Sequence, residues 1–266
     1  MFSGMRWLLV AAGFLVLLAG FQLFILTEYT NSYFAWTIQP FITAAFLGGG
    51  YFSSFLIEFL ASRKTRWVEG RIAVPGVFTF TTLTLIATLL HLDRFHFSGP
   101  GMIAQAAAWF WLSIYAIVPP TMLAMWFQQH HVPGANPKRS MPLPLILRSV
   151  LIIQAIVMLA WGMGLFADPA FSAISWPWKL TPLTSQAVGA WLIGIGVTAG
   201  YAFIENDYSR IRVGLVSYLA FGVLEIIALL RYPASLSWVS WSAWFYLGLI
   251  ISILLVGSYS TKHVVQ

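Results

Sequence analysis

The chain has 266 residues, of which 59% are hydrophobic and only 8% are charged, and its net charge is +6. Because about a quarter of the residues in a soluble domain are charged, this composition excludes a soluble protein and predicts an all-α polytopic membrane protein in a lipid bilayer. The basic residues are scattered over several segments and form no single patch. Topology and contact with anionic lipid therefore explain the charge, and no nucleic-acid partner is expected.

A membrane-spanning helix needs about 20 mostly apolar residues. Runs of this kind follow one another along the chain at about 6–27, 36–60, 71–92, 102–127, 145–167, 186–204, 212–231 and 239–259. They do not alternate polar and apolar residues as the strands of a membrane barrel do. The first run is too long for an ordinary signal-peptide core and lacks a convincing cleavage site. We therefore expect eight transmembrane helices, the first of them retained.

The positions of lysine and arginine predict the orientation of these helices. If the N-terminus is cytoplasmic, the cytoplasmic segments hold all but three of the 14 basic residues. The three on the other side are Arg94, Lys179 and Arg231. By the positive-inside rule, we expect both termini in the cytoplasm and a multi-pass protein of the bacterial plasma membrane.

Short motifs of the first half recur in the same order in the second half. The matched segments are 36–40 and 178–182, 46–50 and 188–192, 56–58 and 203–205, 85–91 and 225–231, and 108–112 and 243–247. Because four is an even number of spans, both copies of a four-helix repeat enter the membrane in the same direction. This predicts two parallel four-helix repeats related by an axis along the membrane normal. The first half is 1–130, the cytoplasmic Pro-rich linker is 131–144, and the second half is 145–266.

Small residues and prolines predict how the helices pack. Glycines and serines lie at close spacings in the runs 36–60 and 186–204, and small residues let membrane helices approach closely. These two helices are therefore the expected inner pair at the axis. Pro119 and Pro120 should kink or break the fourth helix. Glu58 and Glu205, at the cytoplasmic ends of the inner pair, are expected to form ion pairs with Arg63 and Arg210.

Ionisable residues near the outer side are the first functional candidates, because charge within a membrane is costly. Glu225 lies too deep to reach water easily, and it either has a functional role or pairs with Arg231 or Lys179. His91, Asp93 and His96 are metal-ligand types. Residues five apart on a helix point about 140° apart, however, so the two histidines are poorly placed to share an ion, and we predict no metal site. A haem held by two histidines is not expected either, and the sequence identifies no cofactor.

A second candidate site surrounds the two Trp-x-x-x-Pro motifs. Each motif opens one of the inner helices at the outer surface, with polar side chains beside the tryptophan. Aromatic walls with a few polar groups are typical of a small-molecule pocket. The predicted ligand-binding residues are Trp36, Gln39, Thr43, Trp178, Thr184, Ser185, His91 and Glu225.

Catalytic signatures are missing from the sequence. There is no cysteine, no Gly-x-Ser-x-Gly element, and no Walker or His-Glu-x-x-His motif. The duplicated halves favour a small transporter or channel with an outward-facing site for a small molecule or lipid between them. The alternatives are an intramembrane enzyme that uses Glu225 with His91 to His96 at the outer leaflet, and a non-catalytic sensor or assembly module. An oligomer is compatible with all three.

Overall fold

The computed structural model describes residues 1–99, 101–132 and 136–261, and these residues form helices and connecting turns. Eight of the described helices are long and apolar enough to cross a bilayer. They are α1 (Ser3–Gly20, prolonged by the π-helical turn Phe21–Ile25), α3 (Phe41–Ser62), α5 (Ala73–Leu90), α6 (Met102–His131), α7 (Leu145–Ala167), α9 (Pro182–Glu205), α10 (Tyr208–Arg231) and α11 (Trp241–Ser258). The prediction of eight spans is confirmed, and the chain is an integral membrane protein in contact with the lipid bilayer.

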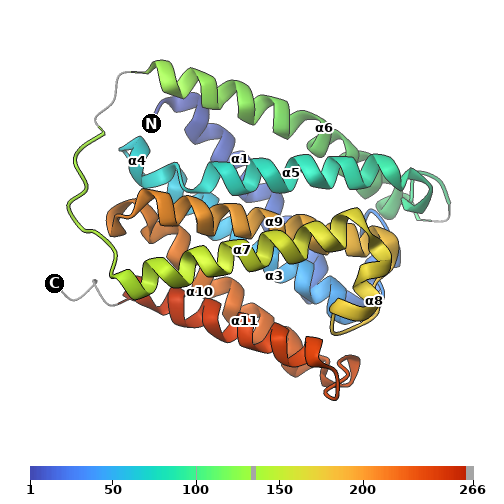
Figure 1. Ribbon diagram of the computed structural model, residues 1–266. Helices are drawn as coiled ribbons and strands as arrows, with labels where there is room; N and C mark the ends of the chain where they lie inside the picture. The colour runs from blue at the N-terminus through green and yellow to red at the C-terminus, as the bar shows by residue number, and fades with distance from the viewer. Residues whose placement is uncertain (100, 133–135, 262–266) are drawn as a thin grey trace.

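The long helices run side by side along one direction (Figure 1). The short helix α4 (Trp67–Gly70) lies at one end of the bundle, where α1 also begins. We call this the α4 end. The opposite end carries α2 (Thr30–Tyr33) and α8 (Ser172–Ser175), and we call it the α8 end.

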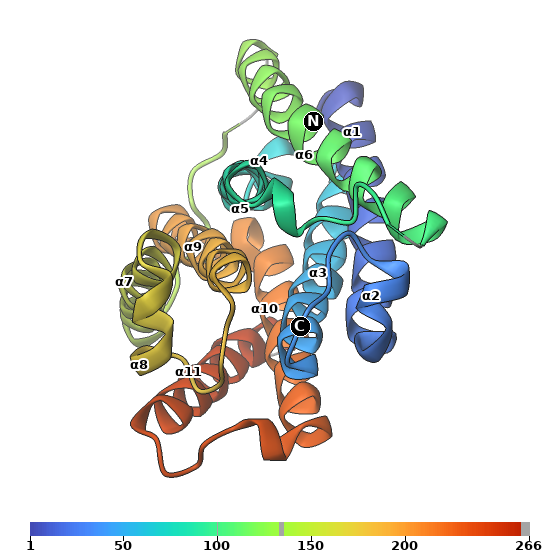
Figure 2. The same ribbon diagram turned by 90° about the vertical axis from the view of Figure 1, so that its right-hand side faces the viewer.

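The helices form a closed ring when they are viewed from the α8 end (Figure 2). Each packs on the next in the order α1, α3, α10, α11, α7, α9, α5 and α6, and α6 returns to α1. The helices α3 and α9 also touch each other across the middle. This contact agrees with the expectation from their small residues.

Burial separates inner from outer helices. In the most apolar stretch of α3, 72% of the residues are buried, against 28% in α6. The low residue volume of glycine makes the close helix contacts possible. A Cβ atom added to Gly189 in α9 would lie 2.7 Å from the carbonyl oxygen of Gly162 in α7, which is too close for any side chain. The helices α3, α5, α9 and α10 are the most buried of the eight.

The fourth spanning helix, α6, continues through Pro119 and Pro120 without a break. Two prolines remove two N–H donors from the helical hydrogen-bond ladder. The helix nevertheless extends on to His131. The expected break is therefore not found, and the expected kink stays a prediction.

The linker between α6 and α7 is fixed to the turn between α9 and α10. The carboxylate of Asp207 accepts hydrogen bonds from the backbone N–H groups of Ser140 (2.8 Å) and Met141 (3.0 Å). The guanidinium of Arg139 donates to the carbonyl oxygen of Glu205 at 2.7 Å. Residues 133–135, which include part of the Pro-rich segment, lie outside the described residues.

Candidate functional site

Two loops meet at the α8 end and build one wall of a hollow. Trp36 and Phe95 form an isolated antiparallel bridge, and the backbone N–H of His96 donates to the carbonyl oxygen of Ala35 at 2.9 Å. The imidazole of His96 adds contacts to Thr37 (3.1 Å) and to a backbone carbonyl oxygen. The segments 34–37 and 95–97 are thereby held together.

The hollow itself has a volume of about 410 Å³ and opens at this end. Its lining residues are Trp36, Thr37, His91, Asp93, Arg94, Thr181, Pro182 and Leu183. His91 is held by a 3.0 Å hydrogen bond between its Nε2 atom and Oε1 of Gln186 in α9. Two of the predicted ligand-binding residues, Trp36 and His91, thus line the same hollow, although Trp36 is itself largely buried.

Three other predicted residues lie in a separate, buried cluster. The indole N–H of Trp178 donates to the hydroxyl of Thr43 at 2.9 Å. The ring of Trp178 packs edge-on against Tyr246 at 5.4 Å between centroids, and the Tyr246 hydroxyl donates to Oε2 of Glu225 at 2.8 Å. We call Phe46, Thr43, Trp176, Trp178, Glu225 and Tyr246 the Glu225 cluster.

The remaining predicted residues join neither group. Thr184 exchanges hydrogen bonds with Thr181 in a capping box that begins α9. The Ser185 hydroxyl donates to the carbonyl oxygen of Leu165 in α7 at 2.8 Å, and Gln39 is exposed. The eight predicted residues therefore do not line one cavity. They divide into a pair that lines the hollow, a buried trio and three separate positions.

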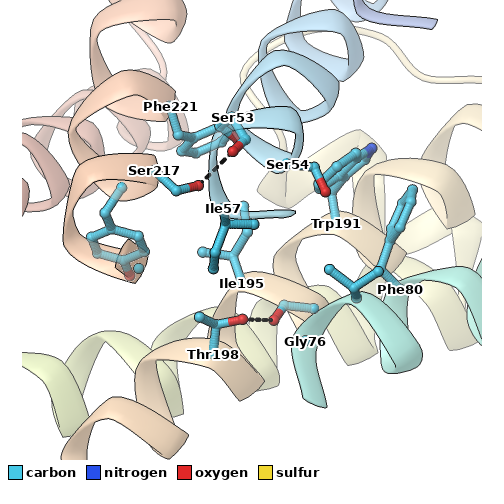
Figure 3. A pocket seen from close by; sticks show the side chains of 14 residues that line it. Ser53, Ser54, Ile57, Gly76, Phe80, Trp191, Ile195, Thr198, Ser217 and Phe221 are labelled. Atoms are coloured by element: carbon cyan, nitrogen blue, oxygen red, sulfur yellow. Dashed lines mark hydrogen bonds between the residues drawn. The ribbon is translucent and has the colours of Figure 1, made fainter. Parts of the chain in front are cut away.

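A central cavity between the inner helices was not predicted from the sequence (Figure 3). The cavity is lined from α3, α5, α9 and α10 by Ser53, Ser54, Ile57, Gly76, Val77, Phe80, Trp191, Gly194, Ile195, Thr198, Gly214, Ser217, Tyr218 and Phe221. Its volume is about 50 Å³, which is enough for a few water molecules. Its only sequence signals are the serines and glycines that also explain helix packing.

Hydroxyl groups and aromatic rings share the wall of this cavity. The Ser217 hydroxyl donates to the Ser53 carbonyl oxygen at 2.7 Å, and the Thr198 hydroxyl donates to the Gly194 carbonyl oxygen at 3.0 Å (Figure 3). Each hydroxyl oxygen keeps lone pairs for a further donor. The wall can therefore accept hydrogen bonds from water molecules in the cavity.

A row of contacting aromatic rings leads from the hollow at the α8 end to the central cavity. Trp36 packs on Trp111, Trp111 on Tyr51, and Tyr51 on Trp191, with centroid distances of 4.8, 6.2 and 5.1 Å. Trp191 then stacks on Phe80 at 3.9 Å. We call these five residues the aromatic plug.

Ion pairs connect α9 to neighbouring segments at the α4 end. The guanidinium of Arg71 binds both carboxylate oxygens of Glu205, at 2.6 and 2.8 Å. Arg210 adds a contact of 3.1 Å to the same carboxylate. The pairing of Glu205 with Arg210 is confirmed. Arg71 is a partner that the sequence did not indicate, because it belongs to a distant turn.

The expected pairing of Glu58 with Arg63 is wrong. Glu58 is fully buried and accepts a 3.0 Å hydrogen bond from Ser54, while the Arg63 guanidinium lies over the ring of Phe59. The side chain of Glu58 faces α1, where Gly13 leaves room for it. A position five residues away along a helix points to another side, and this explains the difference.

Possible metal ligands are dispersed in the ranges that the structure covers. No group of three or more His, Asp or Glu side chains lies close enough there to hold a metal ion. His91 and His96 contact different partners, Gln186 and Thr37.

Comparisons with family models, with curated proteins and with solved structures found no match to this chain.

Proposed function

We propose that the protein is a small transporter with its substrate site between two parallel four-helix halves. The cavity among α3, α5, α9 and α10 carries this proposal. Two of these helices belong to the first half and two to the second. A site between repeats that rock against each other is a common transporter arrangement.

The packing of the helices supports the two-fold relation between the halves. In the first half α1 packs on α3 and α5 on α6, and in the second half α7 packs on α9 and α10 on α11. Between the halves, α5 packs on α9 and α10 packs on α3. In the proposed repeat α1 corresponds to α7, α3 to α9, α5 to α10 and α6 to α11. When each helix is replaced by its counterpart, every one of these contacts becomes another contact in the same set.

The two closures support alternating access. The aromatic plug closes the cavity toward the α8 end, which we place outside the cell. The contact between Arg71 and Glu205 closes the α4 end, which we place in the cytoplasm together with both termini. Arg71 belongs to the first half and Glu205 to the second, so movement of one half against the other would break this contact.

Thiol labelling tests whether the cavity is a water-filled site. The sequence contains no cysteine, so single substitutions Thr198→Cys and Ser217→Cys would be the only reactive thiols. We expect both to react with a small water-soluble thiol reagent in native membranes. Ala44→Cys, at a fully buried position in the same bundle, is the matched control and should stay unreactive. Equal reactivity of all three variants would refute a water-filled site.

The enzyme alternative loses its main support. It required Glu225 and the His91 to His96 segment to converge on one point. Glu225 instead contacts Tyr246, and His91 contacts Gln186. We therefore do not propose a catalytic role.

A further inference from the structure

The Glu225 carboxyl occupies an unusual position for an ionisable group. It lies six residues before the last residue of α10, about 9 Å from the helix end at the rise of an α-helix. Only 1% of its surface is exposed. Oε2 accepts the hydrogen bond of Tyr246, and Oε1 has no hydrogen-bond partner among the described residues.

The basic side chain nearest along the helix is directed elsewhere. Arg231 donates to the carbonyl oxygen of Phe24 and, more weakly, to the hydroxyls of Thr27 and Tyr232. Within the described ranges, no ion pair involves Glu225. The expected pairing of Glu225 with Arg231 or Lys179 is therefore not formed.

The other groups around Glu225 carry no charge that could balance a carboxylate. The cluster contributes Phe46 and Thr43 from α3, Trp176 and Trp178 from the segment before α9, and Tyr246 from α11. Tyr246 is the titratable member besides Glu225. Tyr232 and Arg231 follow at the end of α10, and Lys179 is exposed in the adjoining loop.

The space beside the free oxygen is small. A Cβ atom on Gly49 of α3 would lie 2.6 Å from Oε1 of Glu225, so a larger residue there would have to displace the carboxyl. A metal cation such as Ca²⁺ takes six to eight oxygen ligands, whereas one hydroxyl reaches this carboxyl. A charged carboxylate without a partner has a high free energy in such surroundings, whereas the neutral acid does not.

A tryptophan-rich segment, itself buried, contributes the part of the cluster that lies nearest to α8 in the sequence. Trp176 and Trp178 pack on Tyr246, each with a centroid distance of 5.4 Å, and on each other at 5.0 Å. The hydrogen bond from Trp178 to Thr43 holds this segment to α3. The indole N–H of Trp176 has no partner in the described part of the chain. We call residues 176–178 the Trp-Pro-Trp cover.

We propose that Glu225 is a proton-binding site that exchanges its proton with water at the α8 end when the Trp-Pro-Trp cover moves away. The carboxylic acid releases a proton to water and becomes a carboxylate, which returns to the closed cluster only after it has bound a proton again. This inference rests on the proposed transport function and identifies its coupling ion. The chemistry predicts a substrate that moves together with, or in exchange for, protons.

Infrared spectroscopy of the protein in lipid tests proton binding directly. The difference spectrum between the wild type and Glu225→Gln should contain the C=O stretch of a protonated carboxylic acid at neutral pH. Glutamine keeps an oxygen that accepts the Tyr246 hydrogen bond, so the variant should fold, and gel filtration checks this. Glu58→Gln, which removes the other buried carboxyl of the inner helices that forms no ion pair among the described residues, is the matched control and should leave the Glu225 band in place. Carboxylate bands in place of the acid band would overturn the proposal.

The role of the Trp-Pro-Trp cover is tested by exchange of the same proton for deuterium. Thr43→Val removes the acceptor of the Trp178 hydrogen bond, and Thr43→Ser keeps it. We expect exchange to be roughly fivefold faster in the valine variant, the factor that corresponds to a hydrogen bond worth about 1 kcal/mol. Equal rates in the two variants would contradict exchange through this cover.

The two proposals fail separately. If the cavity thiols react but Glu225 shows no acid band, transport stays supported and the proton site is refuted. If Glu225 shows the acid band but the cavity thiols do not react, the proton site is supported and the transport site is refuted.

Discussion

At the scale of single residues, Asp207 organises the turn between the last two inner helices. Its Oδ1 atom accepts from the backbone N–H and the hydroxyl of Ser209, at 3.0 and 2.6 Å, and so caps α10. Its Oδ2 atom binds the linker at Ser140 and Met141. One carboxylate therefore connects the start of α10 to the segment that enters α7.

We predict that Asp207→Asn destabilises the protein at neutral pH by about 2 kcal/mol, the range for hydrogen bonds to a charged group. Burial raises the pKa of Asp207, but the hydrogen bonds from Ser209, Met141 and Ser140 outweigh it, and the pKa lies below its ordinary value. The stabilisation is therefore present above pH 4 and is lost as the pH falls through the lowered pKa. Thermal unfolding in detergent at pH 7 and at pH 3 measures this, and a stability difference that grows in acid would contradict it.

At the scale of helices, close contacts depend on particular glycines. Gly189 of α9 approaches α7 so closely that a Cβ atom would lie 2.7 Å from a carbonyl oxygen and 2.9 Å from the backbone nitrogen of Phe166. Backbone atoms on both sides leave little freedom to adjust. Gly248 of α11, by contrast, has no atom within 4 Å of such a Cβ.

We predict that Gly189→Ala lowers the free energy of unfolding by about 1–3 kcal/mol, the usual range for overpacking. Gly248→Ala is the matched control, with the same chemical change at an exposed helix position. Because alanine is the better helix former, the control should be neutral or slightly stabilising. Thermal unfolding of both variants in detergent decides this, and equal destabilisation would show that helix contact is not the cause.

The sequence predicts some elements of this structure well because their signals are local. An apolar run needs no partner to be recognised, so all eight spans were found, and the small residues of α3 and α9 marked them as neighbours. The buried position of Glu225 also followed from its depth in a run. Its hydrogen bond with Tyr246 did not, because α11 is packed there by tertiary contacts.

Other features depend on which helices meet. Ser53 and Thr198 are ordinary small polar residues until α3 and α9 place them on one cavity wall. Arg71 lies 134 positions from Glu205, and no local pattern relates the two. The residues of the predicted site therefore lie in separate groups. The prediction had assumed that the matched motifs of the two halves would face each other directly.

At the scale of the whole molecule, the ion pair between Arg71 and Glu205 connects the two proposed halves at the α4 end. Arg71 precedes α5, and Glu205 ends α9. The same two helices contribute Gly76 and Thr198 to the central cavity. Loss of the Arg71 charge should therefore favour separation of α5 from α9 at the α4 end, which is the proposed cytoplasmic side of the cavity.

We predict that Arg71→Gln increases the rate at which Thr198→Cys reacts with a membrane-impermeant thiol reagent applied from the cytoplasmic side. Arg66→Gln is the matched control, because Arg66 lies in the same turn and pairs with Glu69 in an exposed contact. An exposed ion pair contributes about 0–1 kcal/mol, so this change should leave the labelling rate unaltered. Faster labelling in both variants would indicate a general loosening of the turn. Faster labelling in Arg71→Gln alone would identify the Arg71–Glu205 contact as the cytoplasmic closure of the cavity.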